Sequence, residues 1–199
     1  MPTGLPKDFP GQPAQGGPPS VRDAVVMVKT LKQEVHQELV VIKTFSAGSA
    51  GKLEGDIEAK LEAKVVAITT RVDEAKTKIQ TLLASVKPEQ LGESDREELL
   101  SMLSELKDMV EEIEACIVAL AQVLTAKLMS VLLPKLAALK ESLGLLIAPA
   151  IQTAFAICAL VKGDASGVPA KIAFVSNALQ NGLAKSMSPV LALVGKTQL

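Results

Sequence analysis

Apolar residues recur at helical spacing along most of the chain. In residues 20–47, apolar residues recur every seven positions, and a second set of apolar residues lies three positions after the first. The first set is Val21, Val28, Val35 and Ile42, and the second is Ala24, Leu31 and Phe45. This spacing places the apolar side chains on one face of an amphipathic helix and is typical of a coiled-coil-like seam. Ser20 is a favourable N-cap for this first helix.

Two further long helices are predicted. Residues 52–86 end before Pro88 and carry an unbroken heptad of apolar positions, which are Leu61, Val65, Ile68, Val72, Ala75, Ile79, Leu82 and Val86. Residues 94–133 begin with Ser94 and Glu97, the pattern of a capping box. The first half of this third helix is amphipathic, and its second half is apolar on nearly all sides.

The last third of the chain is less regular and more apolar. Residues 142–161 contain no charge, and a final helical pattern runs over residues 170–185. The stretches 115–133 and 143–161 are each long enough and apolar enough for a membrane-spanning helix to be suspected. Because the linker 134–144 separates them, we expect a helical hairpin.

The fold class that these patterns predict is all-α: a bundle of about five long amphipathic helices preceded by a disordered tail. Residues 1–19 hold six Pro and four Gly, a composition that suits neither a helix nor a central strand. Residues 20–199 are expected to form one helical-bundle domain. Aromatic residues make up only 2% of the chain, so the core must be aliphatic, which suits interdigitated helices better than a sheet.

Charge divides the chain into two parts. Residues 116–199 contain seven Lys and two acidic residues, a net charge of +5, whereas residues 1–115 carry −6, for a total of −1. We therefore expect an acidic amphipathic part, 20–115, and an apolar, mildly basic part, 116–199. The sequence has no dense Arg/Lys patch and few rings on which bases could stack, which argues against nucleic-acid binding.

The sequence offers little catalytic or metal-binding chemistry. His36 is the single histidine, and Cys116 and Cys158 both lie inside apolar runs, where a reduced thiol packs as a small apolar group. A zinc site normally takes several His or Cys ligands, and phosphate-loop, dinucleotide and nucleophile-elbow motifs are absent from the sequence. We therefore expect no catalytic residue, no metal and no cofactor, and a protein that is not an enzyme.

Acidic residues crowd the first half of the third predicted helix, between positions 93 and 114. They lack the D-x-D-x-D-G spacing of a calcium loop. We expect them to form a solvated face, and the alternative is a surface for a basic partner.

The apolar stretches allow two interpretations. In the first, both are central helices of the bundle, buried on all sides by the others. In the second, they lie on or enter a lipid surface, and the candidate lipid-surface residues are Lys135, Lys140, Ile151, Phe155 and Lys162. Lys127 and Pro149, near the middle of the two stretches, oppose a permanent transmembrane hairpin.

The function that the sequence favours is a non-enzymatic interaction or scaffold protein that acts through its helix faces, by binding a protein partner or by self-association. The alternative is a protein that associates with a lipid or membrane surface through the hairpin 115–161. The first residues lack the charged and apolar regions of a secretory signal. We therefore expect an intracellular, cytoplasmic protein, or one that is peripherally associated with a membrane.

Overall fold

The computed structural model describes residues 21–48, 54–160 and 167–186. Within these residues the chain forms a short 3₁₀ helix, η1 (Pro88–Gln90), no strand, and five α-helices, which are α1 (Val21–Ala47), α2 (Glu54–Ala84), α3 (Glu93–Val123), α4 (Ala126–Leu160) and α5 (Val168–Ser186). The prediction of an all-α bundle of about five long helices is confirmed. The predicted tail, residues 1–19, and the predicted cap Ser20 lie outside the described residues.

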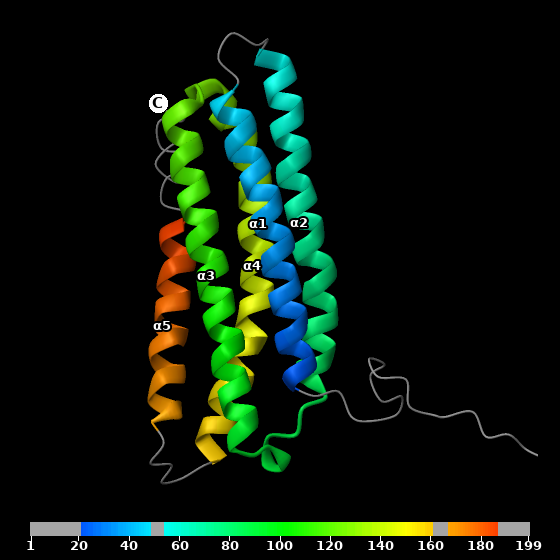
Figure 1. Ribbon diagram of the computed structural model, residues 1–199, viewed down its shortest axis with the longest axis vertical. Coiled ribbons are helices and arrows are strands. Elements are labelled where there is room, and N and C mark those ends of the chain that lie inside the picture. Colours follow the sequence, from blue (N-terminus) through cyan, green and yellow to red (C-terminus); the bar gives the residue numbers. More distant parts are fainter. Residues whose placement is uncertain (1–20, 49–53, 161–166, 187–199) are drawn as a thin grey trace, which may run out of the picture.

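Successive helices run in opposite directions along a common axis (Figure 1). α1 packs against α2 and α3, and α4 also packs against α2 and α3, so these four helices enclose one core. α5 lies outside this group, mainly along α3 and with a smaller contact to α4. Near the end of α5, a Cβ built on Gly182 would lie 3.5 Å from the side chain of Val110 in α3.

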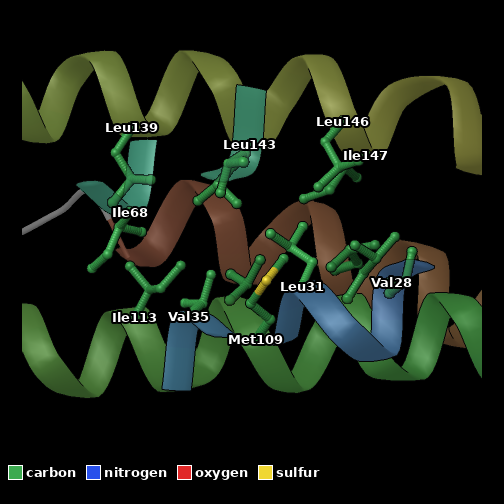
Figure 2. Close-up of a cluster of buried hydrophobic side chains, with 14 of the residues drawn as sticks. Val28, Leu31, Val35, Ile68, Met109, Ile113, Leu139, Leu143, Leu146 and Ile147 are labelled. Atoms are coloured by element: carbon green, nitrogen blue, oxygen red, sulfur yellow. The ribbon is translucent and has the colours of Figure 1, made fainter. Parts of the chain in front are cut away.

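The core is formed by the apolar seams of the helices. Most of the predicted heptad positions of α1 and α2 are confirmed as core positions, and those with 0% exposure include Val28, Val35, Leu61 and Val72. The predicted positions Phe45, Ala75, Leu82 and Val86 are only partly buried against the core. Figure 2 shows aliphatic side chains of α4, such as Leu143, interleaving with those of the neighbouring helices. Each fully buried side chain of this size contributes about 1.5–3 kcal/mol, so these seams hold the helices together.

The predicted capping box of Ser94 and Glu97 is wrong. α3 begins earlier, with Gly92 as its N-cap, and the Gly92 amide donates a hydrogen bond to the Asp95 carboxylate at 2.9 Å. Asp95 stands three positions after the cap, so its short side chain reaches back to the cap amide in the way that a capping box requires.

The third predicted helix, 94–133, is in fact parts of two helices. Leu124 adopts an extended conformation with φ −92° and ψ 149°, and the chain reverses direction between α3 and α4 (Figure 1). Thr125 caps α4, because its Oγ1 accepts a hydrogen bond from the Leu128 N–H at 3.2 Å. The threonine inside an apolar run was the signal for this boundary, since Thr is a favoured N-cap and a poor helix former.

This reversal also corrects the predicted hairpin. Residues 134–144, the expected linker, lie inside α4, which is one helix of 35 residues and contains both Pro134 and Pro149. The stretch 115–133 crosses the boundary between α3 and α4, so it is not one helix that could span a membrane.

We expect Thr125→Ala to lower the free energy of unfolding by about 0.5–2 kcal/mol, because it removes the hydroxyl that caps α4. Thr125→Ser keeps the hydroxyl and is expected to retain most of the stability. Urea denaturation of both variants beside the wild type measures the difference. An Ala variant as stable as the wild type would show that this cap does not stabilise the turn.

Candidate functional site

α4 is the most apolar helix of the bundle, yet only one side of it is buried. In the described part of the chain it is the one helix that is long and apolar enough to cross a membrane, judged by length and composition, and only 39% of its most apolar 18-residue window is buried. The interpretation of this segment as a central helix buried on all sides is therefore wrong. α4 packs on α2, α3 and α5 with one face and exposes the other.

The exposed side of α4 carries an uncharged stripe. Between Ser142 and Leu160 the helix has no charged residue. The exposed positions in this region recur at helical spacing, and we call them the α4 stripe: Leu145, Ala148, Gln152, Phe155, Ala156, Ala159 and Leu160. Leu145 is 47% exposed, Phe155 is 43% exposed and Leu160 is 57% exposed. Large apolar side chains thus lie at three places along a surface that is otherwise built of alanines and one amide.

The structure separates the candidate lipid-surface residues. Phe155 belongs to the α4 stripe, whereas Ile151 is 6% exposed and packs in the core of the bundle. Lys135 and Lys140 are both exposed. They stand five positions apart, about 140° around a helix of 3.6 residues per turn, which places them at opposite edges of the exposed face. Lys162 lies outside the described residues.

A side chain of α2 hydrogen-bonds to the backbone of α4 beside the stripe, at a carbonyl that Pro149 leaves without a donor in its own helix. Proline has no N–H, so the carbonyl four positions earlier, that of Leu145, has no donor within the helix. Gln80 of α2 supplies the missing donor, because its Nε2 lies 2.9 Å from the Leu145 carbonyl oxygen. Gln80 also lines a shallow hollow between α2 and α4, together with Pro149 and Gln152.

A second polar contact joins α2 to α4 at the start of the stripe. The buried hydroxyl of Ser142 donates to Asp73 Oδ1 at 2.7 Å, and Lys76 Nζ lies 3.1 Å from the same oxygen. The hydrogen bond from Ser142, followed by the contact with Lys76, lowers the pKa of the Asp73 carboxyl below its usual value. Both contacts hold α4 against α2 with the stripe facing outward.

The uncharged character continues onto α5. Phe174 is 73% exposed, the highest value among the large apolar side chains of the described residues. It stands two positions after the fully buried Ile172 and so points away from the bundle. Among the exposed side chains of α5 that the structure describes, only Lys171 is charged.

The acidic face of α3 is partly paired inside the bundle. Lys32 Nζ of α1 lies 2.7 Å from Glu105 and 3.3 Å from Asp108, and His36 Nδ1 contacts Glu112. The hydrogen bond to Glu105 is the main reason that the pKa of Lys32 is raised. These three acids thus contact α1, and of them Asp108 also remains exposed to solvent, as expected for the acidic face.

The two thiols have different surroundings. Cys116 is buried in the core, and this burial raises its pKa to about 11, whereas Cys158 is only half-buried. Neither forms a disulfide. The prediction of buried reduced thiols is thus confirmed for Cys116 and holds in part for Cys158. Within the described ranges no group of three or more His, Cys, Asp or Glu side chains could hold a metal ion.

No protein-family model, curated protein or solved structure matches this chain. Function must therefore be argued from the α4 stripe itself.

We expect Ser142→Ala to destabilise the bundle by about 0.5–1.5 kcal/mol at neutral pH, because it removes the hydrogen bond to Asp73. The folded-state pKa of Asp73 is lowered, so its stabilising contribution is present above its ordinary value of 3.8 and is lost as the pH falls through the folded pKa. The difference between variant and wild type should therefore shrink in acid. Urea denaturation at about pH 7 and about pH 2 measures it. A difference that stays constant would contradict the assigned role of the carboxylate.

Proposed function

We propose that the protein is a non-enzymatic interaction protein that binds another protein through the α4 stripe. The observation that carries this proposal is the exposure of an uncharged face on the most apolar helix of the bundle. A helix at the surface of a soluble bundle normally carries charged and polar residues on its solvent side. α1, α2 and the first part of α3 follow this rule, and α4 from Ser142 to Leu160 does not.

The composition of the stripe favours a helical protein partner. Three of its seven residues are alanines, and small side chains at a contact allow a second helix to approach closely. Leu145 and Phe155 supply larger apolar anchors of the kind that dominate binding energy. Gln152 supplies a carboxamide, which a protein partner can pair and lipid hydrocarbon cannot.

A second candidate function is association with a lipid surface through the same stripe. It is supported by Lys135 and Lys140, which lie at the two edges of the exposed face and would meet anionic headgroups there. The length and apolarity of α4 are compatible with this function. The alanines weaken it, because they contribute little apolar surface to lipid contact.

We expect the double variant Leu145→Gln with Phe155→Gln to keep its fold and to lose partner binding by about tenfold or more, because each anchor contributes about 1 kcal/mol or more to the interface. To identify the partner, a photo-crosslinking amino acid replaces Gln152, and the protein is expressed in the cells in which it naturally occurs. Irradiation then links this position to any protein bound beside it. Protein adducts should form there and disappear in the double variant. Position Val26 of α1, which is 56% exposed, is the matched control. Equal adducts at both positions, or adducts that survive the double change, would contradict a partner surface on α4.

The lipid candidate predicts that Lys135→Gln with Lys140→Gln weakens binding to anionic vesicles by about tenfold or more at low salt. Each Lys near an anionic surface contributes about 1 kcal/mol, and salt screens this attraction. Such surface charges contribute little to folding stability, so the variant should remain folded. Vesicle flotation at low and high salt measures the binding. Wild-type protein that stays in the soluble fraction in both salts would exclude the lipid candidate.

A further inference from the structure

We infer that the partner of the α4 stripe is a second copy of this chain, bound antiparallel about a two-fold axis that passes through Gln152. This inference rests on the proposed function, because it identifies the protein that the stripe binds. It is carried by the order of residues along the stripe, which is complementary to its own reverse.

The apolar positions of the stripe match in size across such an axis. In a two-fold antiparallel pair, residues at equal distances before and after the axis face each other. Leu145, seven positions before Gln152, faces Ala159 of the second copy, seven positions after it. Ala148 faces Ala156 of the second copy in the same way. Phe155 and Leu160 lie three and eight positions after Gln152, so they face Pro149 and Gly144 of the second copy. Each large side chain thus lies opposite a smaller residue, which allows the two helices to interdigitate at close distance.

Gln152 selects this register. It is exposed and is the polar member of an otherwise apolar stripe. A carboxamide both donates and accepts hydrogen bonds, so two copies related by the axis can pair with each other. A register that placed Gln152 opposite alanine would bury the amide unpaired, whereas a single polar residue at a matched position specifies alignment in helix pairs.

The length of the stripe sets the expected strength of the dimer. Residues 145–160 extend about 24 Å along a helix. One helix-pair contact of this length buries less than the about 800 Å² per partner of a standard interface. Gln80 on α2 lines a hollow with Gln152 and can widen the contact. We therefore expect a dissociation constant in the micromolar range, about 1–100 µM.

Sedimentation of the full chain tests the dimer. We expect the wild type to change from monomer to dimer with rising concentration in the micromolar range. Gln152→Glu places two carboxylates at the axis and should raise the dissociation constant by about tenfold or more. Gln37→Glu, at an exposed position of α1, is the matched control and should leave the dimer unchanged. A wild type that remains monomeric far above 100 µM would overturn the inference.

Cysteine cross-linking tests the register in a Cys158→Ser background, in which the remaining thiol, Cys116, is buried. Gln152→Cys should form a disulfide-linked dimer on mild oxidation, because only residues at the axis meet their own copies closely enough. Leu145→Cys and Ala159→Cys should each fail alone and cross-link when mixed. Self-cross-linking of Leu145→Cys, or none at Gln152→Cys, would overturn the antiparallel arrangement.

The two proposals fail in different ways. In the first case, the wild type is monomeric, the photo-crosslinker at Gln152 captures a different protein, and this capture is lost in the Leu145→Gln, Phe155→Gln variant. This result would refute the homodimer and leave the α4 stripe as a surface for another protein. A monomeric wild type with no adduct at Gln152 would refute both.

Discussion

Between Ser142 and Leu160, α4 carries uncharged and mostly apolar side chains around its whole circumference, and the bundle buries only the side that faces its neighbours. α2, α3 and α5 cover the side that carries residues such as Leu136, Leu143 and Leu146. The opposite side, with Leu145 and Phe155, remains in contact with solvent. Burial of apolar surface contributes about 25 cal/mol per Å². Covering this face with another molecule would therefore give a favourable free energy of binding. The proposal of a partner follows from this imbalance.

An amphipathic helix is oriented by its own apolar stripe, but a helix that is apolar on all sides needs another device. In α4 two polar contacts with α2 serve this purpose. Ser142 donates to Asp73, and Gln80 donates to the Leu145 carbonyl that Pro149 leaves without a partner. An unpaired polar group in the interface between α2 and α4 would cost about 1–3 kcal/mol. Rotating α4 to hide its stripe would break both contacts, so they keep the uncharged face outside.

The opposite side of the bundle has a different character. Acids of α3 contact side chains of α1, as Glu105 does with Lys32 and Glu112 with His36. Partly exposed ion pairs contribute at most about 1 kcal/mol each, so the main effect of these contacts is on specificity, because they match α1 to α3. The bundle is thus charged and internally paired along α1 and α3, and uncharged and unpartnered along the stripe of α4.

The sequence alone determined the all-α class, the long helices and the buried seams of α1 and α2, because a heptad is a local pattern that reports its own buried face. It did not reveal the reversal at Thr125, since a uniformly apolar run contains no change of period where the chain turns. It also could not separate buried Ile151 from exposed Phe155, which are equivalent choices on a helix without a polar side. Only the tertiary structure decided these points, because the neighbours of an apolar helix, and not its own pattern, determine which face meets solvent.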